Sequence, residues 1–234
     1  MHTRFVYRAI KNLFFPARVY GRRNIAPGEP LIMVANHMGS FGPVSVIVSL
    51  PVKMHPWVAH EVTDLETVAD RIQKEFLEQE LHLKPPLSRH IARVVGRICV
   101  AIMKDIGAIP VYQRSKRIKS TVQESLSLLE EGKNILVFAE NSEKPITEAV
   151  CEFCTGFLHL AKLYYEKTKK AIQFLPIAVN RKVGGILIGK PIRFDAGNPF
   201  PSEKERLKKE LENTVITLYR ELENDFEHRR KRTA

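Results

Sequence analysis

Short apolar runs alternate along the chain with segments of helical periodicity, and this alternation limits the fold more than any other feature of the sequence. Apolar runs predict strands at residues 30–35, 55–59, 107–112, 134–138, 172–179 and 185–192. Helices are predicted between them, at 43–50, 64–83, 88–104, 118–129 and 155–166. Alternating strands and helices predict an α/β sandwich, in which helices flank a mixed or largely parallel sheet.

The last helix has the clearest signals. Ser202, followed by Glu205 three residues later, has the pattern of a capping box at a helix start. One apolar face then follows, made by Leu207, Leu211, Val215, Leu218, Leu222 and Phe226. This spacing predicts one long helix with a continuous apolar face.

The 234 residues fit a single domain of ordinary size, and their charge is unevenly distributed. The chain has 37 Lys and Arg against 26 Asp and Glu, a formal charge of +11. Residues 1–23 carry +6 and residues 228–234 carry +4, so that residues 24–227 are nearly neutral at +1. We therefore predict three parts: an N-terminal basic helix at 1–23, an α/β domain at 24–227 and a basic tail at 228–234.

The first 23 residues interleave their basic side chains with apolar ones. Val6, Ile10, Leu13 and Phe14 have a spacing that places several apolar groups on one helical face. The pattern predicts an amphipathic helix that lies on an anionic membrane surface. The alternative is a helix that packs on the rest of the protein. Nucleic acid is a poor candidate partner, because the body is nearly neutral and has no recognised binding motif.

The sequence also indicates where the protein works. No uncharged apolar run reaches the roughly 18 to 20 residues that a membrane-spanning helix needs. Arg8, Lys11 and Arg18 interrupt the apolar residues near the start, which argues against a cleaved signal peptide. Three cysteines are too few for a disulfide framework and indicate a reducing compartment. We therefore expect a cytoplasmic protein that is peripheral on the inner membrane face.

Several common catalytic motifs are absent from the sequence. It has no phosphate-binding Gly-x-x-x-x-Gly-Lys-Ser/Thr loop, no Gly-x-Gly-x-x-Gly after a strand and no Gly-x-Ser-x-Gly elbow. Cys151 and Cys154 form a Cys-x-x-Cys pair five residues before His159, but the sequence offers only Cys99 as a further thiol. We therefore predict no metal site.

The dipeptide Asn36-His37 stands where a predicted strand gives way to a helix. A histidine at such a strand end can be exposed in a cleft, where its imidazole acts as a general base near neutral pH. It can equally cap the following helix or pack in the turn. The local residues leave both interpretations open.

A wider pattern favours the catalytic interpretation. Segments similar to one family follow in order along the chain, at 19–25, 36–43, 107–114, 138–142, 153–161, 175–178 and 188–192. They resemble the phospholipid/glycerol acyltransferase family, whose lysophosphatidic acid acyltransferases carry Asn-His-x-x-x-x-Asp. The resemblance covers about residues 19 to 195, and it implies the glycerolipid acyltransferase-like sandwich.

The resemblance also implies an activity. It implies direct transfer of a fatty acyl group from acyl-CoA or acyl carrier protein to a glycerolipid hydroxyl such as that of lysophosphatidic acid, in phospholipid biosynthesis. The thioester is a co-substrate, and no cofactor is expected. His37 maps onto the base of the family. The residues expected to bind the acceptor are Asn36, Arg114, Lys116, Asn141 and Ser142.

Two positions depart from the family pattern. Gly42 stands where the family has the Asp that orients the histidine, and Glu143 stands where it has a phosphate-binding Arg. The candidates for the missing carboxylate partner of His37 are Glu61, Asp64 and Glu140. We favour Glu140 and expect it to be part of the catalytic site, because its motif lies at the same site in the family. Two alternatives stay open: a catalytically impaired lipid-binding or regulatory relative, and acyl transfer to a non-phosphorylated acceptor.

Overall fold

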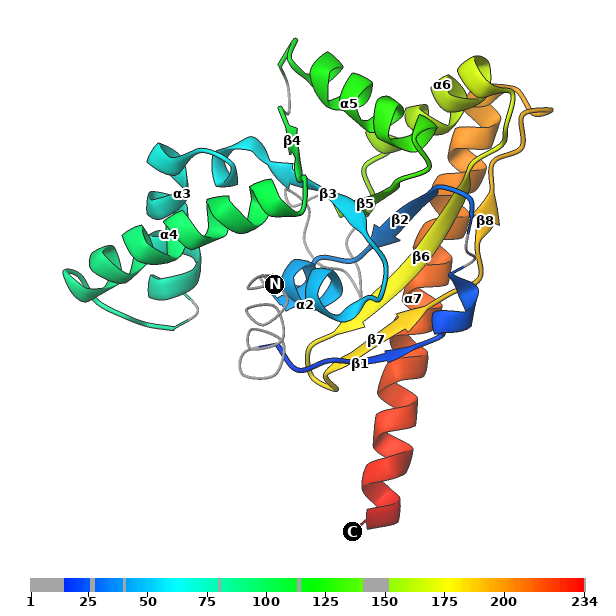
Figure 1. Cartoon of the computed structure of the whole chain (residues 1–234). Coiled ribbons are helices and arrows are strands. Elements are labelled where there is room, and N and C mark those ends of the chain that lie inside the picture. Colours follow the sequence, from blue (N-terminus) through cyan, green and yellow to red (C-terminus); the bar gives the residue numbers. More distant parts are fainter. Residues whose placement is uncertain are drawn as a thin grey trace. The chain divides into compact units, whose positions relative to one another are not determined.

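The computed structural model describes residues 15–25, 28–39, 41–79, 81–112, 115–140 and 152–233. Figure 1 shows its helices and strands in sequence colours. The chain divides into two compact units, the first made of Met1–Val52 with Leu128–Ala234 and the second of Lys53–Ser127. The range 24–227, expected to form the α/β domain, spans both units.

The first unit is built on a sheet. Its strands in the described part of the chain are β1 (Arg18–Tyr20), β2 (Leu31–Ala35), β5 (Asn134–Phe138), β6 (Gln173–Asn180), β7 (Gly185–Ile188) and β8 (Ile192–Arg193). They lie in the order β1-β7-β6-β2-β5, and β8 also pairs with β6. β1 is parallel to β7, and β2 is parallel to both β5 and β6. β6 runs antiparallel to β7 and β8, so the sheet is mixed and mostly parallel, and the prediction of a mixed or largely parallel sheet in an α/β fold is confirmed.

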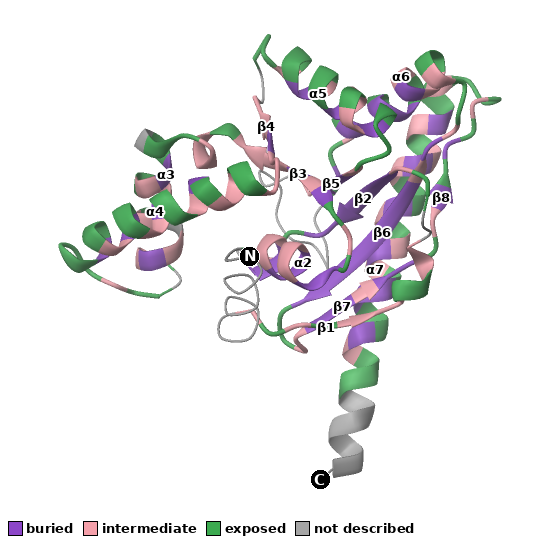
Figure 2. Ribbon diagram, viewed as in Figure 1, coloured by how far each residue is buried: buried purple, intermediate pink, exposed green. Residues whose placement is uncertain are grey.

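Strand β2 forms the centre of this sheet. It lies between β5 and β6, and every side chain from Leu31 to Ala35 is at most 1% exposed. A strand that is covered on both faces needs apolar residues at every position, which explains its uninterrupted apolar sequence. Figure 2 shows β2 and β6 as the most continuously buried strands of the first unit.

The helical elements that the structure describes in the first unit are η1 (Arg22–Asn24), α2 (Phe41–Ser49), η4 (Gly156–Leu158), α6 (His159–Thr168) and α7 (Phe200–Thr233). α7 packs along β6, β7 and β8, as Figure 1 shows. Its predicted apolar face is confirmed at Leu207, Leu211 and Val215, which are fully buried. Phe226 is 44% exposed, so the buried part of the face ends before it. The helix itself continues to Thr233, through the range expected to form a separate basic tail.

The N-terminal prediction requires a correction of its boundary. Arg18–Tyr20 form the edge strand β1 and pair with Gly185–Leu187, and Arg22–Asn24 form the short helix η1. The expected helix over 1–23 therefore does not extend through these residues, because their backbone is used by the sheet. Residues 1–14, on which the rest of that prediction falls, lie outside the described residues. Among the described helices, none is long and apolar enough to cross a membrane.

The second unit contains two parallel strands and a group of helices. The strands are β3 (Met54–Ala59) and β4 (Ile109–Val111). The helical elements are η2 (His60–Val62), α3 (Leu65–Arg71), η3 (Ile72–Glu78), α4 (Leu87–Asp105) and α5 (Ile118–Glu130), the last three residues of which belong to the first unit. The single helix predicted at 64–83 is thus two elements, since the α-helical turns of α3 change to π-helical turns in η3.

The start of α7 depends on one buried carboxylate rather than on the predicted capping box. α7 begins at Phe200, so Ser202 lies inside its first turn. Glu203 is fully buried and accepts hydrogen bonds from Arg206, from the Asp195 N–H at 2.8 Å and from the Asn198 side chain at 3.0 Å. Burial opposes ionisation, but these hydrogen bonds and the charge of Arg206 outweigh it and hold the pKa of Glu203 below its usual value.

Stability is therefore expected to depend on the charge of Glu203. Since its pKa is lower in the folded state, the stabilisation is complete above the unfolded-state pKa of about 4.3 and is lost as the pH falls through the folded-state value. Glu203→Gln should lower the free energy of unfolding at neutral pH by about 1–3 kcal/mol. It should also flatten the decline of stability below about pH 5, measured by urea unfolding at a series of pH values.

The matched control is Glu205→Gln, at an exposed position on the same helix. Its effect should stay within about 0.5 kcal/mol. Equal pH dependence in both variants would contradict the role given to Glu203.

Candidate active site

The register of two parallel strands brings His37 and Glu140 together. In the ladder between β2 and β5, Ala35 pairs with Phe138, and the Ala139 N–H donates to the Ala35 carbonyl at 3.3 Å. His37 and Glu140 each follow their paired residue by two positions. Both side chains therefore lie at the carboxyl edge of the sheet, where parallel α/β folds place their ligands.

The two residues are in direct contact. The backbone N–H of His37 donates a hydrogen bond to Oε2 of Glu140 at 2.5 Å. The imidazole meets the ring of Phe138 edge-on, with 5.5 Å between the ring centroids and 72° between the planes. His37 is exposed, whereas Glu140 is half-buried. The histidine thus has access to solvent while its main chain is held by a carboxylate.

Asn36 has a structural role in this arrangement. It is fully buried, its Nδ2 donates to the Val179 carbonyl at 2.9 Å, and its Oδ1 accepts from the Val179 N–H at 2.7 Å. The side-chain amide therefore continues the pairing of β2 with β6 beyond the end of the strand. The expectation that Asn36 binds substrate is corrected, because both polar atoms of its buried amide are engaged by the protein.

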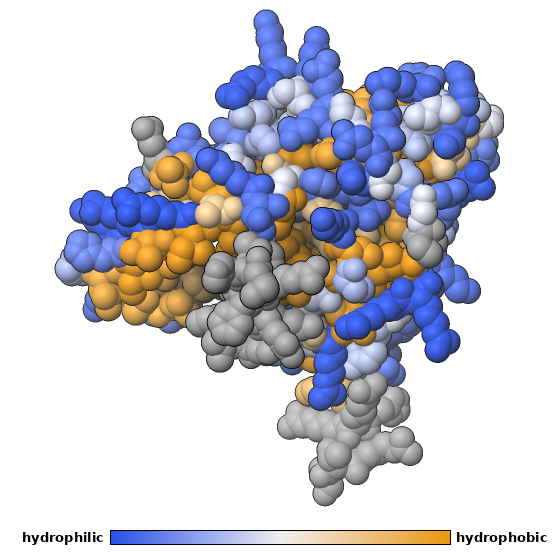
Figure 3. Space-filling model, viewed as in Figure 1, coloured by the Kyte–Doolittle hydropathy of each residue, from blue (hydrophilic) through white to orange (hydrophobic). Residues whose placement is uncertain are grey.

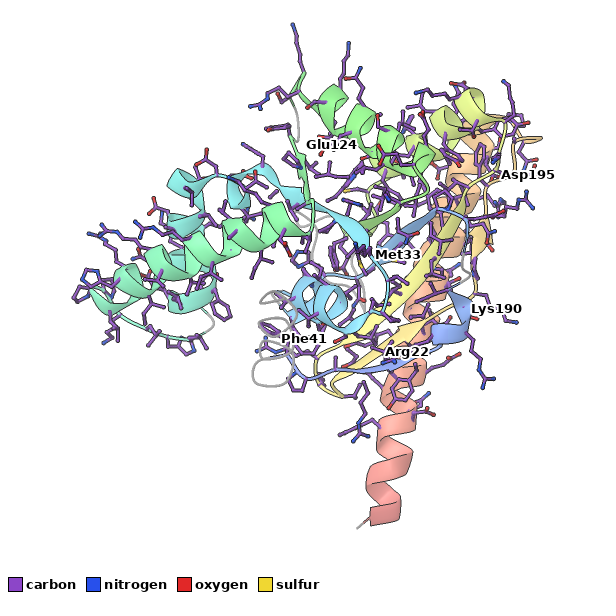
Figure 4. All side chains as sticks on the ribbon, in the orientation of Figure 1. Arg22, Met33, Phe41, Glu124, Lys190 and Asp195 are labelled. Atoms are coloured by element: carbon purple, nitrogen blue, oxygen red, sulfur yellow. The ribbon has the colours of Figure 1, made fainter. Side chains whose placement is uncertain are left out.

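The chain turns sharply at the described residues between His37 and α2. Met38 and Gly39 both have positive φ, at 50° and 62°, which turns the chain sharply behind the histidine. In Figure 4, Met33 and Phe41 label the strand and the helix on either side of this loop. The chain then enters α2, whose second residue is Gly42.

Gly42 is required by the close approach of α2 to the histidine. A Cβ atom at position 42 would lie 1.8 Å from the His37 carbonyl oxygen and 3.1 Å from that of Asn36. Real Cβ atoms do not approach a backbone oxygen so closely, so the observed loop has room for no side chain there. The observed loop conformation therefore requires a residue without a side chain at position 42, which excludes an acid there.

A second set of contacts holds Glu140 in place. Its backbone forms an isolated antiparallel bridge with Phe153, and the Cys154 N–H donates to the Ala139 carbonyl at 2.7 Å. The Phe153 N–H donates in turn to Oε1 of Glu212 on α7, at 2.6 Å. α7 therefore supports the backbone on which Glu140 is carried. No motif in the sequence marked Glu212, since nothing local links it to residues 140 or 153.

Of the remaining predicted site residues, the structure describes only one. Arg114, Asn141 and Ser142 lie outside the described residues, as does Glu143. Lys116 is exposed in the turn before α5, in the second unit, and so in a different unit from His37.

The fold is that of a solved acyltransferase. The structure superposes on the 1-acyl-sn-glycerophosphate (LPA) acyltransferase PlsC from Thermotoga maritima with a TM-score of 0.56 and 17% sequence identity. The match covers 93% of this chain and 75% of that chain. No protein-family model matches the sequence, and a search of curated proteins finds no match. The expected glycerolipid acyltransferase-like fold is therefore confirmed at the level of architecture.

Restoring an acid at position 42 should damage the protein rather than improve it. Gly42→Ala and Gly42→Asp each introduce a Cβ against the His37 carbonyl. We expect Gly42→Ala to lower the free energy of unfolding by about 1–3 kcal/mol, with Gly42→Asp at least as damaging. Urea unfolding measures both. Gly156→Ala is the matched control, because a Cβ at position 156 meets no atom within 4 Å. A Gly42→Asp variant as stable as the wild type would contradict the close approach.

Proposed function

We propose that the protein is an acyltransferase that moves a fatty acyl group from an acyl thioester to a hydroxyl group of a glycerolipid. The observation that carries this proposal is the exposed His37, at the carboxyl edge of a sheet whose architecture is that of an LPA acyltransferase. The imidazole is a suitable general base near neutral pH, and its exposure gives a substrate hydroxyl access to it.

In the proposed reaction His37 removes the proton from the acceptor hydroxyl as its oxygen attacks the thioester carbonyl carbon. The resulting tetrahedral intermediate collapses, the carbon–sulfur bond breaks, and the imidazolium returns the proton to the leaving thiolate. The acyl group passes directly from sulfur to oxygen, and the free thiol is the second product. The donor class is acyl-CoA or acyl carrier protein.

In this proposal Glu140 is a positioning residue. Its carboxylate accepts the His37 backbone N–H, and this contact sets the position of the imidazole through the main chain. It replaces, from a neighbouring strand, the orienting function that the family assigns to an Asp at the position of Gly42. Arg114, Lys116, Asn141 and Ser142 remain the residues proposed to bind the acceptor. We propose that the acyl transfer takes place on an anionic, cytoplasmic membrane face, because the chain is basic overall and most strongly so at its ends.

One observation favours a second candidate function. Position 42 has no room for an acid in the observed loop, so the Asp that the resemblance assigns to this position is replaced by a glycine. Loss of an orienting carboxylate costs about 10⁴ in turnover in a serine protease triad. A lipid-binding or regulatory protein that retains the fold without turnover is therefore the alternative. Transfer to a non-phosphorylated acceptor is a variant of the main proposal.

Thiol release tests the proposal. The wild type is incubated with acyl thioesters and with lysophosphatidic acid, glycerol 3-phosphate or a neutral alcohol as acceptor. We expect acceptor-dependent release of free thiol, and at least a hundredfold loss, roughly, in His37→Ala, because the general base is removed. The matched control is His159→Ala, an exposed histidine on α6 of the same unit, which should retain wild-type turnover. Equal release by wild type and His37→Ala across the panel would favour the lipid-binding alternative.

The role of Glu140 is tested by comparing two substitutions. Glu140→Gln keeps a side-chain oxygen that can accept the His37 N–H, whereas Glu140→Ala removes the acceptor altogether. If Glu140 acts by position, Glu140→Ala should lower turnover about tenfold or more, and Glu140→Gln should recover most of that loss. Equally large losses in both variants would show instead that the negative charge is what His37 requires.

A further inference from the structure

Exposed apolar side chains gather in one part of the second unit. Among the large hydrophobic residues that the structure describes as exposed, Phe226 lies on α7 and every other one lies between residues 65 and 98. These others are Leu65, Leu81, Leu87, Val94 and Ile98, with exposed fractions of 49% to 58%. Single exposed apolar residues are ordinary, but a concentration within one short region indicates an interaction surface.

Helix α4 buries small residues and exposes larger apolar ones, which is the reverse of an ordinary surface helix. Its buried positions are Ser88, Ala92, Gly96 and Val100, four residues apart, and all but the last are small. They lie on the side that packs against α3, where a Cβ on Gly96 would come within 3.1 Å of Val68. The small residues thus allow α3 and α4 to pack closely, while larger apolar side chains are left on the outside.

The outer side of α4 carries two parallel rows. Leu87, Ile91, Val94 and Ile98 recur at intervals of three or four residues and form the apolar row. Arg89, Arg93 and Arg97 are all exposed, stand four residues apart and form the arginine row. From Leu87 to Asp105 the helix has a single acidic residue, at its last position. Figure 3 shows hydrophobic atoms beside strongly hydrophilic ones over α3 and α4.

We propose that the outer side of α4 is a docking surface for an anionic lipid bilayer. A helix with one apolar row and one basic row can place the apolar side chains among acyl chains while the arginines meet lipid phosphates. The apolar row over Leu87 to Ile98 extends about 17 Å along the helix axis, long enough to lie flat on a membrane. The arginine row is complementary in charge to anionic head groups.

A bilayer fits this surface better than a second copy of the chain. A symmetric dimer places the same patch on both partners. The arginine row of one copy would then face a patch that contains no carboxylate before Asp105. A bilayer with anionic lipids supplies the negative charge that the row lacks and also the apolar phase that the neighbouring row needs. The surface belongs to the second unit, whereas the charged ends from which the sequence predicted membrane contact belong to the first.

This inference deepens the proposed function, because an enzyme of membrane glycerolipids must reach its acceptor in the bilayer. Vesicle binding tests it without any acyl donor, so a failure of binding and a failure of acyl transfer can be told apart. The full-length protein is mixed with vesicles of phosphatidylcholine alone or of phosphatidylcholine with phosphatidylglycerol. The bound fraction is then measured by co-sedimentation. We expect binding to the anionic vesicles that weakens as salt is raised.

Two multiple variants test the contributions of the arginine row and the apolar row to vesicle binding separately. Arg89→Gln/Arg93→Gln/Arg97→Gln should weaken binding to anionic vesicles about a hundredfold. Val94→Ser/Ile98→Ser should weaken it about tenfold or more, because both side chains lose their transfer into the apolar phase. All of these positions are exposed, so the variants should remain folded. Turnover of a water-soluble thioester and acceptor pair should be retained in both.

Matched controls remove similar groups elsewhere. Lys182→Gln/Lys190→Gln/Lys209→Gln removes three exposed positive charges from the first unit, and Phe226→Ser removes its exposed aromatic ring. Both should bind vesicles within about threefold of the wild type. Equal weakening by test and control charge variants would overturn the proposal in favour of diffuse electrostatic attraction. A wild-type dimer that Val94→Ser/Ile98→Ser converts to a monomer, together with no vesicle binding, would overturn it in favour of a second copy.

Discussion

The hydrogen bond from the His37 backbone to the Glu140 carboxylate is the contact on which the candidate site depends. It forms because β2 and β5 are parallel and in a register that ends both strands at the same edge. Asn36 fixes the same turn to β6 from the other side, through two hydrogen bonds to Val179. The histidine is therefore exposed at the end of a chain segment whose backbone is held by its neighbours in the sheet.

This arrangement gives a physical account of Gly42. The loop brings the start of α2 so close to the His37 carbonyl that no Cβ fits at that position. An acid cannot be restored there without moving the loop or the helix. The carboxylate beside His37 comes instead from the strand end at Glu140, whose backbone is bridged to Phe153 and thereby supported by Glu212 of α7. The site is thus built from the sheet and α7 together.

The sequence predicted the parts of this account that depend on local pattern. The strand before His37 follows from an uninterrupted apolar run, and the apolar face of α7 follows from helical periodicity. The family resemblance pointed to His37 and Glu140, which the structure brings into contact. The roles of Asn36 and Gly42 depend on which distant backbone atoms lie beside them, which periodicity does not contain. For α4, apolar periodicity is the same whether a face points inward or outward. Only the structure shows that the small residues, including Gly96, are buried and the larger apolar ones exposed.

The most direct measurement is hydrogen exchange of the His37 backbone amide, followed by NMR on ¹⁵N-labelled protein. The hydrogen bond to Glu140 predicts an amide that exchanges at least fivefold more slowly, roughly, in the wild type than in Glu140→Ala. In Glu140→Gln the amide should recover most of that protection, because an acceptor oxygen remains. An amide that exchanges equally fast in the wild type and in Glu140→Ala would contradict the claim that this carboxylate holds the histidine in place.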